Sequence, residues 1–358
     1  GIRFWSGNIC NQPSLFCMAS RSRSPRGGEK IEVDVPDLAH ARKIAVEAVL
    51  AACKLTSRVQ EKLTEEAVVK KADQSPVTVA DLGAQAVISR MLEDSFPGVP
   101  LLAEEDAGQL QADPHLAQEV VSEVRVAFPG LSTESVLADL DRGNHSGGQG
   151  LFWVLDPVDG TKGFLRREQY AVCLGLIKEG RVLLAVLGCP NLPVDPSMPE
   201  GERGCLFIAV HGQGASQYDI SNGLEKRISV SSVTDASEIL CVESVEAGHS
   251  NHGSQASLSD TLGIKRSPKR MDSQCKFGVV ARGEAGLYLR FSSKDQFIWD
   301  IAAGAMIVEE AGGQVSDALG APLNFAHGRT IGTGNLFASN RVFHAEVLQA
   351  IEKTQVPK

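Results

Sequence analysis

The sequence predicts a mixed protein, an α+β domain followed by an α/β domain. Its 358 residues are enough for about two domains. Helical periodicity comes first, and a series of short apolar strands follows, which is typical of an antiparallel sheet covered by helices. From about residue 236 strands and helices alternate, which is typical of an α/β unit. We therefore expect an N-terminal domain over residues 34–235 and a C-terminal domain over residues 236–358, preceded by a tail at 1–33.

Two helices are expected at the start of the first domain. Over Asp37–Leu63 the apolar residues repeat at intervals of three and four, and Asp37 can cap the first turn. The segment around Pro76 is expected to be extended, and Asp81 is expected to open a second helix that runs to Leu92. A carboxylate at a helix start is commonly only a cap, so Asp81 alone has a structural explanation.

Strands make up most of the remaining first domain. The strand Val99–Ala103 ends in three acids, Glu104–Asp106, and a helix with loops is expected over Leu110–Leu140. Further strands, expected to form one antiparallel sheet, lie at Tyr170–Ile177, Val182–Gly188, Leu206–Val210, Gly214–Tyr218 and Arg227–Val230. In the second domain, strands are expected at Ile239–Glu243 and Gly286–Phe291, and helices at Ser254–Leu262, near Phe277 and from Asp300.

One turn carries the clearest chemical signal. The apolar run Leu151–Leu155 reads as a buried strand, and it breaks into Asp156-Pro-Val-Asp-Gly-Thr161. Asp156 and Asp159 can face the same side of this turn, and the Val158 carbonyl and the Thr161 hydroxyl lie beside them. Such a set of hard oxygen donors suits Mg²⁺. A surface turn without any metal is the alternative.

Composition excludes several classes of partner. The formal net charge is −9, so we expect neither nucleic acid nor an anionic membrane as a partner. An anionic substrate then needs positive charge at its own site. None of the eight cysteines forms a C-x-x-C pair, which disfavours a zinc site. Cys189 and Cys205 flank two apolar strands whose antiparallel pairing can bring them together, either as a redox-sensitive pair or as two small apolar residues.

The first thirty residues differ from the rest of the chain. They hold four arginines among Ser, Pro and Gly, and the first acidic residue is Glu29. This composition is typical of a transit peptide for the chloroplast or the mitochondrion. A plain tail on a cytoplasmic protein is the alternative.

Acidic residues at four element ends form a recognisable set: Asp81, Glu104, Asp156 with Asp159, and Asp300. The Asp156–Thr161 turn resembles the first signature of the lithium-sensitive, Mg²⁺-dependent phosphatase superfamily that includes inositol monophosphatase and fructose-1,6-bisphosphatase. Trp299–Gly304 with Glu310–Gly313 resembles its second signature. The resemblance implies a layered αβαβα sandwich.

Within that superfamily the chain is most similar to the plant and fungal 3'(2'),5'-bisphosphate nucleotidases. The matching segments are Ser75–Asp81, Leu155–Leu165, Gln169–Val172, Cys189–Pro193, Glu243–His249, Asp272–Lys276 and Leu287–Arg290. The resemblance implies hydrolysis of 3'-phosphoadenosine 5'-phosphate to AMP and phosphate. It extends to 3'-phosphoadenosine 5'-phosphosulfate and inositol 1,4-bisphosphate as further substrates, and to inhibition by Li⁺.

The resemblance also implies the metal ligands. Glu104, Asp156 and the Val158 carbonyl would hold one Mg²⁺, and Asp156, Asp159 and Asp300 a second. A third, weaker Mg²⁺ would lie near Glu104 and Asp81. Thr161 and Asp81 would then orient and deprotonate the attacking water, with Glu104 completing the catalytic set.

Substrate contacts follow from the same motifs, at Gly160, Thr161, His249, Ser273, Lys276 and Arg290. Three of these residues have a simpler explanation: Ser273 as a helix cap, Lys276 as a solvated helix residue, and Arg290 as an edge-strand charge. His252 could replace His249. The family usually has His after the Trp-Asp pair, where this chain has Ile301. Two other functions stay open, an inositol phosphate phosphatase with the same metals and a weakly catalytic metal- and nucleotide-binding sensor.

Overall fold

The computed structural model of the protein describes residues 35–63, 76–246 and 252–354. The expected tail, and with it the organellar targeting signal, lies outside these ranges, as does His249. Residues Val33–Lys358 form one compact unit. The expected boundary near residue 235 falls between two sheets of this unit, and its division into two domains stays a prediction.

A seven-stranded sheet contains strands β1 to β7 in chain order. Their bounds are β1 Leu101–Ala103, β2 Leu151–Asp159, β3 Ala171–Lys178, β4 Arg181–Pro193, β5 Arg203–Val210, β6 Gly214–Asp219 and β7 Glu225–Ile228. The pairs from β3 to β7 are antiparallel, as expected; β2 also pairs antiparallel with β3, whereas β1 runs parallel to β2. Strand β2 does not stop at Leu155, because an irregularity between Asp156 and Asp159 lets the turn sequence stay paired with β3.

Two long helices, α1 Leu38–Glu61 and α3 Pro76–Ser95, pack against one face of this sheet. Asp37 caps α1, accepting a hydrogen bond from the Ala39 N–H at 3.0 Å, as expected. The expected extended segment before Asp81 is wrong, because α3 already begins at Pro76. The first turn of a helix does not need the N–H that proline lacks. Asp81 therefore lies inside α3 and does not cap it.

Shorter helices lie outside α3. These are α4 Gly108–Ala112, α5 Pro114–Ala127 and α6 Thr133–Asp141, and both α5 and α6 pack against α3. In the described ranges, no helix combines the length and the apolar character needed to cross a membrane.

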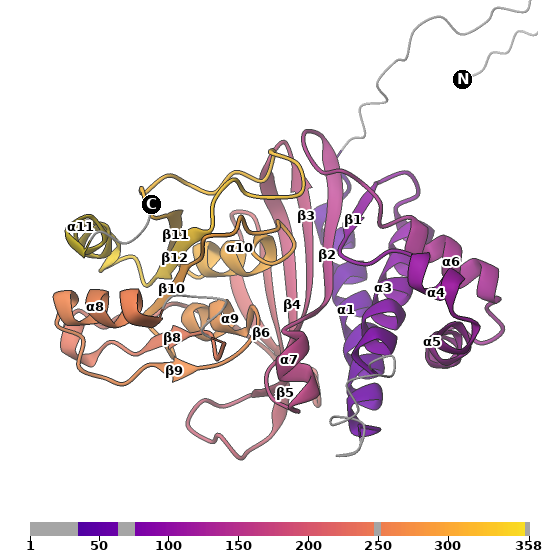
Figure 1. Ribbon diagram of the computed structural model, residues 1–358, viewed down its shortest axis with the longest axis horizontal. Coiled ribbons are helices and arrows are strands. Elements are labelled where there is room, and N and C mark those ends of the chain that lie inside the picture. The colour runs from indigo at the N-terminus through magenta and orange to yellow at the C-terminus, as the bar shows by residue number, and fades with distance from the viewer. Residues whose placement is uncertain (1–34, 64–75, 247–251, 355–358) are drawn as a thin grey trace, which may run out of the picture. The chain divides into compact units, whose positions relative to one another are not determined.

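The other face of the large sheet is covered by α9 Cys275–Ala281 and α10 Ala302–Glu310. Beyond them lies a second sheet in the order β11-β12-β10-β8-β9. Its strands are β8 Cys241–Glu243, β9 Lys269–Arg270, β10 Leu287–Phe291, β11 Gln314–Asp317 and β12 Asn335–Ser339, with a 3-10 turn at Ala236–Glu238 before β8. Helices α8 His252–Leu262 and α11 His344–Thr354 complete an αβαβα sandwich, which confirms the expected fold (Figure 1).

Strand β2 is held from both sides. Trp153 and Leu155 point into the core beneath α1 and α3, whereas Phe152 and Val154 belong to the core shared with α9 and α10. All four side chains are buried, and the burial of each stabilises the folded state by roughly 1.5–3 kcal/mol. The carboxyl end of β2, where the acidic turn lies, is therefore fixed by packing on two faces.

The structure places Cys189 directly opposite Cys205 in the β4–β5 pair. Both are buried, and both thiols are free. The expected proximity is confirmed, and oxidation of the pair stays a prediction.

Candidate active site

Three carboxylates meet at the end of β2. Oxygens of Asp156, Asp159 and Asp300 lie within 4.8 Å of one another. Asp300 comes from the turn before α10, which begins at Ala302, so the expectation that Asp300 opens or caps this helix is wrong. Burial and then the negative charge of Asp159 raise the pKa of Asp300 to about 7. Burial and the neighbouring carboxylates, Glu104 foremost, also raise the pKa of Asp156 well above its usual range.

Glu104 joins this group through the parallel pairing of β1 with β2. Ala103 is aligned with Leu155, so Glu104, the residue that follows β1, comes out beside Asp156 of β2. Although Glu104 is exposed on one side, the surrounding protein displaces water from its carboxylate. Together with the charges of Asp300 and Glu105, this raises its pKa to about 8.

Asp81 approaches the same point from α3. It is buried, and its pKa is raised by burial and then by Glu105 and Glu104. Helix α3 also fixes the acidic strand end, because the Gln85 amide donates to the Glu105 carbonyl at 2.7 Å and accepts from its N–H at 3.1 Å. No sequence pattern marks Gln85 as part of the site, since a glutamine inside a helix belongs to no motif.

This donor set fits hydrated Mg²⁺. Carboxylates that raise one another's pKa are relieved by a divalent cation, and hard oxygen ligands are those that Mg²⁺ prefers. Asp156, Asp159 and Asp300 would hold such an ion, with Glu104 beside them. The Val158 N–H donates to the Asp156 carboxylate at 3.1 Å, while the Val158 carbonyl as a ligand and the number of ions stay predictions.

Gln274, the N-cap residue of α9, links three parts of the site. Its backbone N–H donates to the Asp159 carboxylate, its side-chain amide donates to the Trp299 carbonyl at 2.8 Å, and its side-chain oxygen accepts from the Gly304 N–H at 2.9 Å. The residue is buried. It thus sets the turn that carries Asp300 against the end of β2. The sequence analysis included it in a motif but gave it no role.

A short helix that the sequence analysis did not predict, α7 Thr161–Leu165, follows β2 directly. Gly160 precedes it with φ +89°, and a Cβ there would lie 2.9 Å from the Cβ of Ser273. Glycine is therefore required for both the backbone conformation and the close approach. The structure thus brings Gly160 and Ser273 together, and exposed Thr161 begins the helix beside them. The Ser273 hydroxyl accepts from the Cys275 N–H at 3.2 Å; Ser273 itself lies one residue before the N-cap of α9, Gln274, and is not the cap.

Two cationic side chains, Lys276 and Arg290, lie close enough to Asp159 and Asp300 to act on their charges. Lys276 is 3% exposed and donates to the Met271 carbonyl at 3.2 Å, so its interpretation as a solvated residue is wrong. Arg290 belongs to β10, which pairs with both β12 and β8, so it is not an edge-strand charge. Burial opposes the charge of Arg290, but Tyr288 and Asp300 outweigh it and raise its pKa. The positive charge of Lys276 opposes the rise that burial causes in the pKa of Asp159.

Comparison with known proteins identifies the family. The sequence profile of the inositol monophosphatase family matches residues 37–355. The chain belongs to the inositol monophosphatase family. Among solved structures, an inositol monophosphatase from Anabaena (Nostoc) sp. PCC 7120 superposes with a TM-score of 0.58 at 23% identity, covering 89% of this chain and 97% of that chain. At this level of identity, the similarity shows a shared fold.

Relatives of this chain carry a name that is more specific than the name of the family. The chain is 40% identical to a protein from Schizosaccharomyces pombe named 3'(2'),5'-bisphosphate nucleotidase, covering 86% of this chain and 94% of that protein. It is 43% identical to 3'(2'),5'-bisphosphate nucleotidase 1 of Arabidopsis thaliana, covering 75% and 82%. The resemblance to plant and fungal members that the motifs predict is thereby confirmed.

Two further residues named from the sequence can now be placed. Ile301, which stands where the resemblance implies a His, is fully buried in the core, so its side chain packs away from solvent. His252, offered in place of His249, begins α8, and its Nε2 lies 3.0 Å from the Ser244 carbonyl oxygen.

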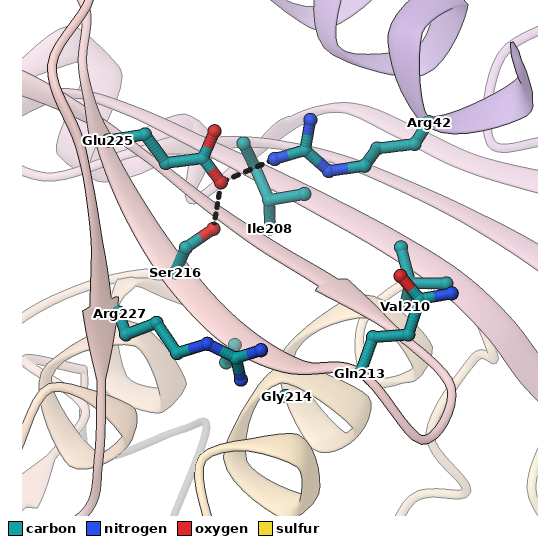
Figure 2. A pocket seen from close by; sticks show the side chains of 9 residues that line it. Arg42, Ile208, Val210, Gln213, Gly214, Ser216, Glu225 and Arg227 are labelled. Atoms are coloured by element: carbon teal, nitrogen blue, oxygen red, sulfur yellow. Dashed lines mark hydrogen bonds and ion pairs between the residues drawn. The ribbon is translucent and has the colours of Figure 1, made fainter. Parts of the chain in front are cut away.

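A separate cavity of about 400 Å³ lies between α1 and strands β5 to β7 (Figure 2). Arg42 and Glu225 form an ion pair on one wall, and Arg227 and Gln213 lie on the other. None of the predicted site residues lines this cavity. The acidic site and this cavity are therefore distinct features of the family member.

Proposed function

We propose that the chain is a Mg²⁺-dependent phosphatase that removes the 3'-phosphate of 3'-phosphoadenosine 5'-phosphate, giving AMP and phosphate. One observation carries the proposal. The three carboxylates of Asp156, Asp159 and Asp300 interact with two cations, the buried Lys276 and the half-buried Arg290. A substrate with two phosphates suits such a site, because metal ions can take one phosphate and fixed cations the other. The names of the relatives support the same substrate class.

The chain's own groups divide the work. Asp156, Asp159 and Asp300, with Glu104, would hold the ions. Bound Mg²⁺ supplies charge neutralisation on the phosphoryl oxygens and makes water a better nucleophile. Asp81 acts as the general base: it lies buried next to Glu105 and Glu104, and burial raises its pKa above that of a solvated carboxyl, which makes the carboxylate a stronger base.

The other residues position the reactants. Thr161, exposed at the first turn of α7, orients the attacking water through its hydroxyl. Ser273, Lys276 and Arg290 bind the nucleotide end, and the glycine before Thr161 leaves room for the close approach of Ser273. These residues would thereby keep the attacking water in line with the phosphorus–oxygen bond that breaks, and within reach of the base that takes its proton.

Phosphate release from four substrates tests the proposal. The full chain with Mg²⁺ is assayed on 3'-phosphoadenosine 5'-phosphate, 3'-phosphoadenosine 5'-phosphosulfate, inositol 1,4-bisphosphate and inositol 1-phosphate, with and without Li⁺ and with a chelator. We expect turnover of the nucleotides, loss on chelation and inhibition by Li⁺. Exclusive turnover of inositol 1-phosphate would show an inositol phosphate phosphatase instead. Nucleotide binding without any turnover would support the sensor.

A metal-ligand variant provides the second test. Asp156→Asn is expected to lower turnover at least ~100-fold, since it removes a charge from the carboxylate group. Asp141→Asn, at an exposed position on α6, is the matched control and should keep wild-type rates. Equal turnover rates in the two variants would show that Asp156 is not needed as a metal ligand.

We propose in addition that residues 1–33 direct the protein to the chloroplast or the mitochondrion. The arginine-rich, acid-poor composition of this segment supports the proposal. A fluorescent protein fused behind this segment should enter the organelle, and a purely cytoplasmic signal would refute it.

A further inference from the structure

One face of α7 lies directly against the segment that leads into α9. Gly160, Gly163 and Arg166 follow one another at intervals of three and so share a helix face. A Cβ on Gly160 would lie 2.9 Å from the Cβ of Ser273, and one on Gly163 would lie 3.0 Å from the Cβ of Asp272. Because these two positions lack a Cβ, the backbone of α7 can approach Ser273 and Asp272 closely. Arg166 is the next residue on the same face.

Arg166 forms ion pairs with three carboxylates. Its guanidinium forms an ion pair with Asp272, donates to Glu246 at 2.8 Å and donates to Glu168 at 2.7 Å. The Asp272 side chain is 4% exposed, whereas that of Glu246 is 27% exposed. Among the described residues, Arg166 is the only ion-pair partner of Asp272. Lys162 shares Glu246 at 3.0 Å, and the Glu168 side chain is 54% exposed to solvent, so Asp272 is the buried carboxylate that depends on Arg166 for charge balance.

Charge balance at Asp272 matters because of where this residue lies. It directly precedes Ser273, and Lys276 lies four residues beyond it. A buried carboxylate without a partner would compete with an incoming phosphate for the charge of Lys276, and it would repel that phosphate itself.

We propose that Arg166 is a positioning residue for the nucleotide end of the substrate. It neutralises Asp272 and ties α7 to the Asp272–Lys276 segment, which leaves the charges of Lys276 and Arg290 free for an anionic group. Arg166 acts through Asp272 and does not itself touch the reacting atoms. The inference rests on the proposed function, since it assumes a substrate with a second phosphate.

Steady-state kinetics of the full chain at saturating Mg²⁺ test the role. Arg166→Gln should raise KM for 3'-phosphoadenosine 5'-phosphate about 10-fold and leave kcat within about 3-fold. For 3'-AMP, which lacks the second phosphate, KM (or the inhibition constant, where turnover is too slow) should change by less than about 3-fold. Arg125→Gln is the matched control, because this exposed arginine of α5 donates only to the Leu131 carbonyl among the described residues.

Two further variants separate electrostatics from a merely structural clamp. Adding Asp272→Asn to Arg166→Gln removes the unpaired carboxylate, so KM should return to within about 3-fold of wild type. Arg166→Lys keeps the charge without the planar fork and should give an intermediate KM. The double variant also answers the case in which Arg166→Gln alone fails to fold, since it no longer buries an unpaired charge.

Several results would overturn the inference. These are an unchanged KM in Arg166→Gln, an equal rise for both substrates, a fall in kcat alone, or a double variant as impaired as the single one. If the wild-type chain releases no phosphate from either nucleotide, the proposed function itself fails and the inference fails with it. That outcome is distinct, because it appears before any variant is made.

Discussion

Removing divalent cations should make the stability of this protein fall as the pH rises from about 6 to about 8. The reason is the carboxylate group at the end of β2. The pKa values of Asp300, about 7, and Glu104, about 8, lie above those of unfolded chains. Below these values the native state keeps protons that the unfolded state has lost, which favours the native state. As the pH rises through them, the protons leave and the like charges repel.

The magnitude follows from one titrating group. A proton held by the native state alone changes the free energy of unfolding by about 1.4 kcal/mol per pH unit. We apply this to Asp300, because Glu104 is exposed and solvent screens it. Because Asp300 is already half deprotonated at pH 7, the loss between about pH 6 and pH 7 is about 1 kcal/mol, or a fall in Tm of roughly 1–2 °C for a chain of this length.

Protonation of His344 changes the stability in the opposite direction, so its contribution must be separated from that of the carboxylates. Burial lowers its pKa to about 4, so below about pH 6.5 the unfolded imidazole binds a proton that the native one does not. Its contribution to stability therefore rises with pH up to that point. The useful quantity is the increase in Tm caused by Mg²⁺ at each pH, in which the His344 contribution cancels.

Thermal unfolding in chelator and in saturating Mg²⁺ measures that increase. We expect it to grow from about pH 6 to about pH 8, as the cation replaces protons on the carboxylates. Asp300→Asn should weaken both the pH dependence and the response to Mg²⁺, while the exposed control Asp141→Asn should behave as wild type. A Mg²⁺ increment that is the same at both ends of the range would refute the reasoning.

Three further predictions concern the supports of the site. Gly163→Ala places a Cβ 2.0 Å from a backbone oxygen and should cost about 2–4 kcal/mol in urea unfolding, against about 1 kcal/mol for Gly98→Ala, where the space is open. Gln274→Ala leaves buried backbone groups without partners and should cost about 2–4 kcal/mol and weaken Mg²⁺ binding measured by calorimetry. Ile301→His should lower Tm by roughly 4 °C without restoring any contact to the metal, since this side chain is buried in the core; a stabilised variant would contradict that placement.

Much of the fold could be predicted from local patterns. The α1 cap at Asp37, the antiparallel series from β3 to β7 and the alternation of strands and helices after residue 236 all follow from periodicity and turn residues within about ten positions. The beginning of α3 could not, because a proline reads equally well as a helix start or as part of an extended segment. Strands β11 and β12 were missed, since short buried strands among loops lack a distinctive period.

The sequence by itself determined the chemistry of this protein, because carboxylates, a hydroxyl and cations at particular motif positions specify what can be bound. The tertiary structure alone decided how those groups are held. The parallel pairing that places Glu104 beside Asp156, the amide of Gln274 and the ion pair of Arg166 with Asp272 join residues far apart in the chain. Such contacts depend on packing between layers, and no local pattern encodes which distant partner a buried polar group will meet.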